Sequence, residues 1–452
     1  MSAENTNLTP LPSSRALPRD LPSDKETSPC SGDGVPPARN DGSSAMTIKG
    51  GKVVRFGDVC LPASKSESNR ALMIAAYGGF DADFQNLSDS NDTRVLKNTL
   101  LSLPSIDSIS PTSQRRNDIE GSQHVIDIAD CGTAARFMTT YLACREGEWL
   151  LTGTERMKRR PIQPLVNALL ELGADIRYVE KQGFLPLLIH GRPLQGGRVA
   201  VDMTQSSQFA SSLLMAAPMW PQGIELELVG NPSSLPYLDM TIAMMRHFSA
   251  QVERQDRVVI VKPQPYQKQP FTIESDWTAA SYWYEMAAFS EECEIRLCGL
   301  SAPSTGLGTA QGDAIIAEWM VQLGVGTFVE NDAVVLRKIP FEKRHLHFDF
   351  SQHPDLYPTM AATCAGLRVD ATFTGLDNLS FKESDRVEAM RTELAKMDSR
   401  PIRFCAHDDH RIVMALAPLS LFVGPVGFDH PEVVQKSYPD FWDDADFLPV
   451  MG

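Results

Sequence analysis

The segment Leu226-Glu227-Leu228-Val229-Gly230 shows the pattern that decides the fold, because it is an apolar strand that ends in glycine. Three other segments share this pattern: Leu150-Leu151-Thr152-Gly153, Arg296-Leu297-Cys298-Gly299 and Thr372-Phe373-Thr374-Gly375. After each glycine comes a turn with charged or hydroxyl residues, and then an amphipathic helix. The glycines recur at intervals of roughly 69 to 77 residues, much longer than a solenoid repeat, which indicates a repeated fold unit.

Periodicity predicts the elements inside each unit. One helix is indicated by apolar residues at helical spacing, namely Val387, Met390, Leu394 and Met397. Another follows Pro161, which suits a first helical turn, and carries Leu165, Val166, Leu169 and Leu170. Two of the predicted helices end at a glycine that strand-like residues follow, in Leu172-Gly173-Ala174 and Leu323-Gly324-Val325. Each unit is therefore predicted as strand, helix, strand. A less clear instance of the same strand-and-helix pattern begins at residues 84–87 and is followed by a helix near Asp92.

The stretch Lys65-Ser66-Glu67-Ser68-Asn69-Arg70 places two cations and two hydroxyls at the predicted start of a helix. Unpaired backbone N–H groups and the positive end of the helix dipole favour an anion there, so a phosphate or carboxylate would suit this position. The same residues also fit an ordinary serine cap followed by surface cations.

The fronts of other predicted helices carry similar groups. They comprise Arg156, Lys158, Arg159 and Arg160; Ser234 and Tyr237; Lys382, Glu383, Asp385 and Arg386; and the loops 130–136, 206–208, 408–411 and 436–440. Taken singly, each has an ordinary interpretation as a solvated charged face, a plain cap or a surface ion-pair network. Their recurrence at the same position is explained if the helix N-termini converge, so we expect one anion-binding cleft.

The composition describes a large acidic globular protein. The chain has 452 residues, 42% of them hydrophobic, and a formal net charge of -15, so it can bury a large core in two or more units. The negative charge argues against nucleic-acid binding, and an anionic ligand then needs a local cluster of cations. No apolar run is long enough to cross a bilayer. Eight cysteines without CxxC or zinc-like spacing predict reduced thiols in a soluble cytoplasmic protein. Residues 1–45 are expected to form a disordered tail.

Taken in order, these segments resemble the 5-enolpyruvylshikimate-3-phosphate (EPSP) synthase family over about residues 48–445. Residues 61–72 are similar to the family's phosphate-binding signature, with Ala63 where glycine is common. Residues 130–136 resemble the family's Asn-Ala-Gly-Thr-Ala-x-Arg loop and match it at Gly132, Thr133 and Arg136. The resemblance is completed in the second half by Lys382-Glu383, Asp385-Arg386 and Asp409-His410-Arg411.

The resemblance implies an α/β (α+β) fold, a two-domain inside-out α/β barrel with three βαβαββ repeats in each domain. One domain is expected over residues 64–274 and the other over 46–63 plus 275–452, with the active site in the interdomain cleft. The implied reaction transfers the enolpyruvyl (carboxyvinyl) group of phosphoenolpyruvate to the 5-hydroxyl of shikimate 3-phosphate and releases phosphate, in chorismate and aromatic amino acid biosynthesis. The enzyme would be a monomer acting on these two small molecules, without nucleic acid, membrane, cofactor or metal.

The resemblance also implies roles for individual residues. The shikimate 3-phosphate set would be Lys65, Ser66, Arg70, Ser206, Ser207, Gln208, Ser234, Asp355, Asn378 and Lys382. The phosphoenolpyruvate set would be Lys65, Gly132, Arg156, Gln208, Arg386, Arg411 and Lys436. Glycine at position 132 would let the backbone approach the small substrate closely. The catalytic residues, which would divide acid and base duties, would be Asp355, Glu383, Lys65 and Lys436.

Departures and alternatives stay open at this point. Asp130-Cys131 stands where the family usually has Asn-Ala. The span between the first two motifs, which is polar and irregular over residues 102–123, is shorter than typical. Both departures bear on phosphoenolpyruvate affinity and glyphosate sensitivity. The sister enzyme that transfers the same group to UDP-N-acetylglucosamine typically has a cysteine in the loop that corresponds to residues 156–160, where this chain has none. A non-catalytic relic that only binds anionic metabolites would have little reason to keep Asp355, Glu383, Lys65 and Lys436.

Overall fold

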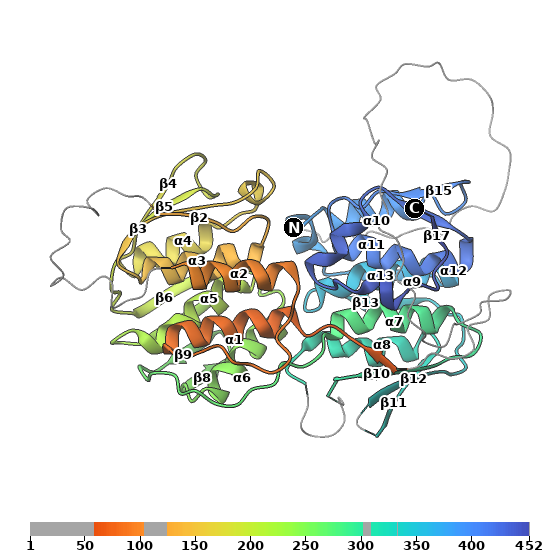
Figure 1. Ribbon diagram of the computed structural model, residues 1–452, viewed down its shortest axis with the longest axis horizontal. Coiled ribbons are helices and arrows are strands. Elements are labelled where there is room, and N and C mark those ends of the chain that lie inside the picture. Colours follow the sequence, from red (N-terminus) through yellow and green to blue (C-terminus); the bar gives the residue numbers. More distant parts are fainter. Residues whose placement is uncertain (1–57, 104–123, 302–308, 332, 452) are drawn as a thin grey trace, which may run out of the picture.

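The computed structural model describes residues 58–103, 124–301, 309–331 and 333–451, which form two lobes (Figure 1). Each lobe has its own hydrophobic core. One core runs from Ala63 to Ile273, while the other takes in Val59 and Leu61 and resumes at Trp277. Figure 1 shows the first lobe on the left, in orange to green, and the second on the right, in green to blue except for an orange strand from the start of the described chain. The expected tail at 1–45, like 46–57, lies outside the described residues.

The first lobe contains two complete units. The first comprises β2 (His124–Asp127), α3 (Gly132–Ala143), β3 (Gly147–Thr152), α4 (Gln163–Glu171), β4 (Asp175–Tyr178) and β5 (Leu187–Gly191). The second comprises β6 (Gly197–Asp202), α5 (Gln208–Ala216), β7 (Ile224–Val229), α6 (Leu235–His247), β8 (Val252–Gln255) and β9 (Val258–Val261). The remaining part of the lobe has α1 (Lys65–Gly78), α2 (Asn91–Ser102) and a bridge between Gln85 and Thr272.

The second lobe repeats this order in full only in its first unit, and its next two units form sheets of two and three strands within the described residues. Its first unit comprises β1 (Asp58–Cys60), α7 (Trp277–Phe289), β10 (Glu294–Cys298), α8 (Ile316–Val321), β11 (Val325–Glu330) and β12 (Ala333–Lys338). The next has β13 (Leu346–Asp349), the 3₁₀ helix η5 (Pro354–Leu356), α9 (Tyr357–Leu367), β14 (Ala371–Thr374), η6 (Asp377–Phe381) and α10 (Arg386–Leu394). The last has β15 (Ile402–Phe404), α11 (His410–Leu416), α12 (Ser420–Val423), β16 (Val426–Phe428), η8 (Pro431–Lys436), α13 (Phe441–Asp444) and β17 (Val450–Met451).

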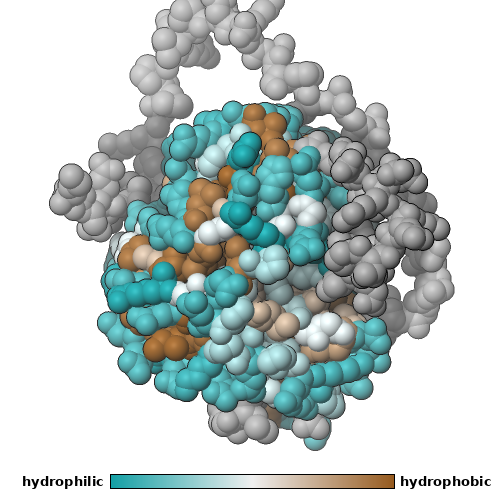
Figure 2. All heavy atoms as spheres, turned by 90° about the vertical axis from the view of Figure 1, so that its left-hand side faces the viewer, coloured by the Kyte–Doolittle hydropathy of each residue, from teal (hydrophilic) through white to brown (hydrophobic). Residues whose placement is uncertain are grey.

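The units place their helices inside and their sheets outside. The three four-stranded sheets share one order, β2-β3-β5-β4, β6-β7-β9-β8 and β1-β10-β12-β11, in which the first two strands are parallel and the others antiparallel. Buried and partly exposed residues alternate along β7, so the sheet has one face in the core. Every residue of α7 is buried, which is typical of a helix surrounded by protein. The outer face of the first lobe is mostly hydrophilic (Figure 2).

The predicted repeat is confirmed, with small shifts at two helix ends. The glycine-ended strands are β3, β7, β10 and β14, and the strands expected after the glycine stops are β4 and β11. Helix α4 begins at Gln163, two residues after Pro161, with Pro164 in its first turn. Helix α10 ends at Leu394, because the N–H of Met397 bonds to the carbonyl three residues back and tightens the chain into a turn.

The chain passes between the lobes twice at one place. The N–H of Ser64 donates to the carbonyl of Glu274 at 2.8 Å, and the N–H of Asp276 donates to that of Pro62 at 2.8 Å. Between these bonds Ala63 and Ser275 form an antiparallel bridge. We therefore propose domain boundaries within these two crossings, at 63/64 and 274/275.

The described cysteines, Cys60, Cys131, Cys144, Cys293, Cys298, Cys364 and Cys405, are all free thiols. Among the described residues, the helices are too short or too polar to cross a membrane.

We predict that Gly375→Ala destabilises the protein far more than Gly173→Ala. Both glycines have positive φ, +70° and +89°, where a Cβ costs about 1–2 kcal/mol. At Gly375 the added Cβ would also collide with the Asp349 carboxylate and the Ser351 backbone, whereas nothing lies within 4 Å of it at Gly173. Urea unfolding should therefore show at least ~2 kcal/mol of additional loss for Gly375→Ala. Equal losses would mean that the turn after β14 is not the tight packing point described.

Candidate active site

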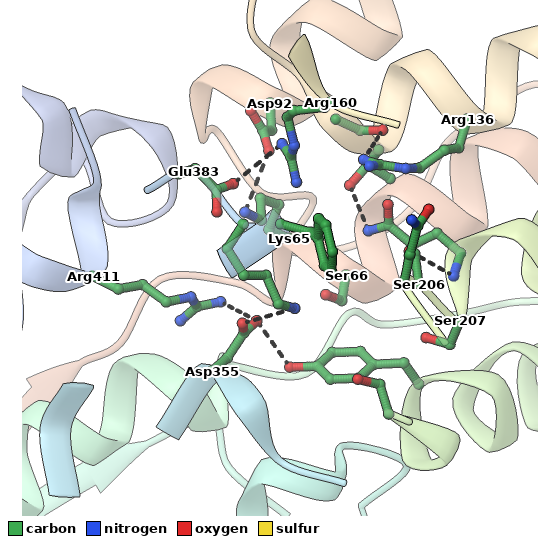
Figure 3. A pocket seen from close by; sticks show the side chains of 18 of the residues that line it. Lys65, Ser66, Asp92, Arg136, Arg160, Ser206, Ser207, Asp355, Glu383 and Arg411 are labelled. Atoms are coloured by element: carbon green, nitrogen blue, oxygen red, sulfur yellow. Dashed lines mark hydrogen bonds and ion pairs between the residues drawn. The ribbon is translucent and has the colours of Figure 1, made fainter. Parts of the chain in front are cut away.

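Seven helices of the described chain begin at one pocket between the lobes (Figure 3): α1, α2, α3, α5 and α6 of the first lobe, and α10 and α11 of the second. Side-chain caps fix several of these starts, because Ser64, Asp385 and Asp409 each accept a backbone N–H of the following turn. The predicted convergence of helix fronts is confirmed. The free N–H groups and the positive dipole ends of these helices favour an anion.

The described residues that line the pocket carry more positive than negative charge. The cations are Lys65, Arg136, Arg160, Lys382, Arg386 and Arg411, and the carboxylates are Asp92, Asp355 and Glu383. Much of the remaining lining is hydroxyl or amide, from Ser66, Thr133, Gln205, Ser206, Ser207, Gln208, Ser234 and Tyr237. In a protein with a net charge of -15, this is a local positive site suited to a polar anionic ligand.

Arg386 connects three carboxylates at the base of α10. Its Nε donates to Asp409 at 2.8 Å, Nη1 to Asp355 at 2.8 Å and Nη2 to Glu383 at 2.9 Å. The guanidinium is only 1% exposed. Burial alone would lower the pKa of Arg386, but Asp409, Glu383 and Asp355 outweigh it and raise that pKa above its ordinary value. The guanidinium is therefore always charged.

Asp355, from η5, is surrounded by donors. Arg411 Nη2 lies 2.8 Å from one carboxylate oxygen, Lys382 Nζ lies 3.4 Å from the other, and the Tyr237 hydroxyl donates at 3.2 Å (Figure 3). Burial would raise the pKa of Asp355, but Arg411, Lys382 and Arg386 hold it well below its usual range. Asp355 is therefore ionised at neutral pH and can accept a proton.

Glu383 lies where the second lobe meets the 156–160 turn of the first. Its Oε1 is 3.6 Å from Arg160 Nη1, and its backbone carbonyl accepts a hydrogen bond from Arg156 Nε at 3.1 Å. Burial would raise the pKa of Glu383, but Arg160, Arg386 and Lys436 together hold it well below its ordinary value. Glu383 is thus a second ionised carboxylate.

Asp92 lies between two lysines that come from different lobes. Its Oδ2 is 3.3 Å from Lys65 Nζ, and its Oδ1 is 3.6 Å from Lys436 Nζ. Figure 3 shows Lys65 near the centre of the site, between Asp92 and Ser66. The ammonium of Lys65 therefore borders the pocket with one carboxylate partner.

Gly132 makes room for two guanidinium groups. Arg136 Nη1 donates to the carbonyl of Gly132 at 2.8 Å. A Cβ on Gly132 would lie within 3.0 Å of terminal nitrogens of both Arg136 and Arg160. Burial, together with Arg160, lowers the pKa of Arg136 to about 9. Two neighbouring guanidiniums therefore place positive charge at this side of the pocket.

Most of the residues predicted from the sequence line the pocket: Lys65, Ser66, Gly132, Ser206, Ser207, Gln208, Ser234, Asp355, Lys382, Glu383, Arg386 and Arg411. Four do not. Arg70 lies behind the wall, donating to the Thr241 hydroxyl and to two backbone carbonyls. Asn378 is buried, and its side-chain amide makes no hydrogen bond within the described residues. Arg156 bonds to the Glu383 backbone and Lys436 to Asp130.

Several lining residues were given no role by sequence reasoning. Arg160 rather than Arg156 lines the pocket, although both belong to one basic run. Asp92 stands two residues after Ser90, which caps α2, so the helix-front pattern could have identified it. His410 is fully buried, and burial together with Lys65 and Arg411 lowers its pKa well below the ordinary value, so it is neutral. Gln205 and Phe381 carry no sequence signal that we can identify.

Metal binding finds no support in the described residues. No group of three or more His, Cys, Asp or Glu side chains in that part of the chain is arranged to hold a metal ion. The positive charges that face the pocket belong to lysines and arginines.

Comparison with known proteins identifies the family. The sequence model described as EPSP synthase (3-phosphoshikimate 1-carboxyvinyltransferase) matches residues 49–445. The chain belongs to the EPSP synthase family. Its relatives include the 3-phosphoshikimate 1-carboxyvinyltransferase of Bacteroides fragilis (strain YCH46), which is 42% identical over 405 residues, or 85% of this chain and 93% of the relative. The enzyme of the same name from Aliivibrio salmonicida is 33% identical over 425 residues, covering 87% and 97%.

A solved structure supports the fold of the family. The EPSP synthase of Acinetobacter baumannii superposes with a TM-score of 0.64 at 19% identity, covering 88% of this chain and 96% of that one. The two-domain inside-out α/β fold predicted from the sequence is therefore confirmed.

We predict that Arg386→Met destabilises the protein by about 3–5 kcal/mol at pH 8, because it leaves buried carboxylates without their partner. The depressed pKa values of Asp355 and Glu383 contribute stability above the ordinary carboxylate range, and this contribution is lost as the pH falls through their folded values. In the variant these pKa values rise, so the loss should be smaller at pH 5 than at pH 8.

Arg391→Met on the same helix is the control, since Arg391 pairs only with exposed Glu388. Urea unfolding at both pH values should show little change for it. A loss for Arg386→Met as small as that of the control would contradict the network.

Proposed function

We propose that this pocket is the active site for the transfer of the enolpyruvyl group of phosphoenolpyruvate to the 5-hydroxyl of shikimate 3-phosphate, with release of phosphate. This is the 3-phosphoshikimate 1-carboxyvinyltransferase activity of the family, a step of the shikimate pathway to chorismate and the aromatic amino acids. The observation that carries the proposal is the excess of cations around one pocket at which helices of both lobes begin. Two phosphorylated carboxylates repel each other, and charge-assisted hydrogen bonds of roughly 1.5–3 kcal/mol each can hold them together.

Shikimate 3-phosphate would bind on the side of the pocket rich in hydroxyls. Its phosphate fits the fronts of α5 and α6, where Ser206, Ser207 and Ser234 lie, and Gln208 donates to the Thr133 hydroxyl beside them. Its ring hydroxyls would face Asp355 and Lys382, with Ser66 beside them. Asn378 stays in the proposed set because its buried side-chain amide has no hydrogen-bond partner within the described residues. Arg70 would act as a positioning residue, because it holds α1 against α6 through Thr241 and the Tyr237 carbonyl.

Phosphoenolpyruvate would bind on the side rich in guanidinium groups. We assign its anionic groups to the lining residues Lys65, Gly132, Arg160, Gln208, Arg386 and Arg411. Lys436 joins the set from the edge of the pocket, because its ammonium lies 3.6 Å from the lining residue Asp92. Arg160 replaces Arg156 in this set because only Arg160 of the two lines the pocket. Gly132 keeps this side open to a small ligand.

The proton transfers follow from the charge states of the site. Asp355 is ionised, so it would take the proton of the attacking 5-hydroxyl. Both carboxylates are ionised, so the proton for the methylene carbon has to come from a cation. We assign it to Lys65, which lines the pocket, whereas Lys436 is bonded to Asp130. Lys65 would then take a proton back from the methyl group as phosphate leaves, with Glu383 as the alternative base for that step.

Two further properties belong to the same proposal. We propose that the protein is cytoplasmic, which the free thiols of the described cysteines support. We also propose that it acts as a monomer, since one chain supplies the cations and carboxylates that the proposed reaction needs. The rival transfer to UDP-N-acetylglucosamine has no specific observation in its favour.

Phosphate release from phosphoenolpyruvate and shikimate 3-phosphate tests the proposed function. The wild-type protein should turn over, and Lys65→Ala should lose about 100- to 1000-fold in kcat, because it removes a charge at the reacting centre. Arg160→Gln should raise the KM for phosphoenolpyruvate. Lys158→Gln is the matched control in the same turn, since Lys158 pairs with Glu155 and Glu180 instead. No wild-type turnover would refute the function, and unchanged Lys65→Ala and Arg160→Gln variants would refute the residue roles.

We predict that Gly132→Ala raises the KM for phosphoenolpyruvate about tenfold or more while the KM for shikimate 3-phosphate changes little. The new methyl group would displace the Arg136 and Arg160 guanidiniums, which are flexible side-chain ends, so the fold should tolerate it. Steady-state kinetics with each substrate varied in turn measure the effect. An unchanged KM for phosphoenolpyruvate would place that substrate away from the front of α3.

A further inference from the structure

Lys436 of the second lobe is held by carboxylates of the first. Its Nζ lies 2.5 Å from Asp130 Oδ2 and 3.0 Å from the carbonyl of Asp130, and Asp92 Oδ1 is 3.6 Å away. Lys436 ends η8, whereas Asp130 stands in the loop between β2 and α3. The pair therefore joins the lobes across the edge of the active site.

Two of the three N–H donors of the Lys436 ammonium group form hydrogen bonds with Asp130, and Asp92 Oδ1 lies at ion-pair distance from the same group. A ligand anion that binds Lys436 has to displace Asp130 or Asp92, or else lie beside their carboxylates. In the second case these carboxylates already neutralise the positive charge of the Lys436 ammonium. Asp92 is shared with Lys65, so it serves both lysines. Within the described residues, Lys436 is the ion-pair partner of the Asp130 carboxylate, which is 42% exposed, whereas the Lys436 side chain is 8% exposed.

The surroundings agree with a strong pairing. Burial would lower the pKa of Lys436, but Asp92, Glu383 and Asp130 raise it above its ordinary value. Burial would raise the pKa of Asp130, but Lys436 and then Arg156 lower it. Asp130 also precedes Gly132 by two residues, so its charge lies next to the guanidinium-rich side of the pocket.

We propose that Asp130 is a specificity-determining residue, whose carboxylate occupies Lys436 in the manner of a ligand anion and so weakens the binding of phosphoenolpyruvate. This proposal rests on the proposed function. Asp130 weakens phosphoenolpyruvate binding in two ways. Its carboxylate pairs with Lys436, and its negative charge repels the anionic substrate. Shikimate 3-phosphate is not affected, because Ser206, Ser207 and Ser234 bind it from the fronts of other helices.

The test is Asp130→Asn, which removes the charge but keeps the size of the side chain, an acceptor for Lys436 and the backbone carbonyl. The KM for phosphoenolpyruvate should fall about 3- to 30-fold, the range expected for removing a unit charge ~7 Å from an anion in a partly solvated site. The KM for shikimate 3-phosphate should stay unchanged. Asp130→Glu, a separate single variant, keeps the negative charge. Its KM for phosphoenolpyruvate should therefore lie closer to that of the wild type than the KM of Asp130→Asn does.

Asp239→Asn is the matched control, because it removes one carboxylate from an ion pair, with Arg254, elsewhere in the first lobe. It should leave both KM values unchanged. A selective gain in affinity cannot arise from damage to the fold, so that result supports the proposal. An unchanged or raised KM for phosphoenolpyruvate, or an equal change for both substrates, overturns it. Absence of wild-type turnover would instead remove the proposed function itself.

Discussion

The pairing of buried charges is the constraint on which the rest of the structure depends. Arg386 is almost inaccessible to solvent and connects Asp409, Asp355 and Glu383, which come from three separate parts of the second lobe. Each of these groups would be costly to bury alone. Together they hold η5, α10 and α11 at one point. Arg386 also helps to lower the pKa of two pocket carboxylates, after Arg411 and Lys382 for Asp355 and after Arg160 for Glu383. The same network faces Arg160 of the first lobe, so the stability of the second lobe and the charge of the site have one origin.

The inside-out fold explains how so many charged groups reach one pocket. Each unit buries its helix beneath a sheet and turns at the end of the second parallel strand, where Gly230, Gly299 and Gly375 adopt positive φ. The helices that follow Gly230 and Gly375, α6 and α10, start at the pocket, and so do α3, α5 and α11, which follow the first strands of their units. The units therefore bring several helix fronts to one edge of each lobe, and the chain passes between the lobes beside the bridge of Ala63 and Ser275.

The parts that the sequence predicts are those with local signals. Strands such as β7 end in glycine, and helix fronts such as Lys65-Ser66 carry hydroxyls and cations, so the repeat and the pocket could both be inferred. The sequence could not predict that Arg160 rather than Arg156 lines the pocket. A run of like charges does not show which side chain a short 3₁₀ turn directs inward. The pairing of Asp130 with Lys436 joins residues 306 positions apart and depends on how the lobes meet.

The central claim is that one pocket neutralises two anionic substrates with cations from both lobes. A crystal structure with shikimate 3-phosphate and an unreactive analogue of phosphoenolpyruvate tests it most directly. The account predicts both ligands side by side between the lobes, with their anionic groups in contact with Lys65, Arg160 and Arg386. Ligands bound elsewhere on the surface, with those three cations in contact only with protein carboxylates, would contradict it.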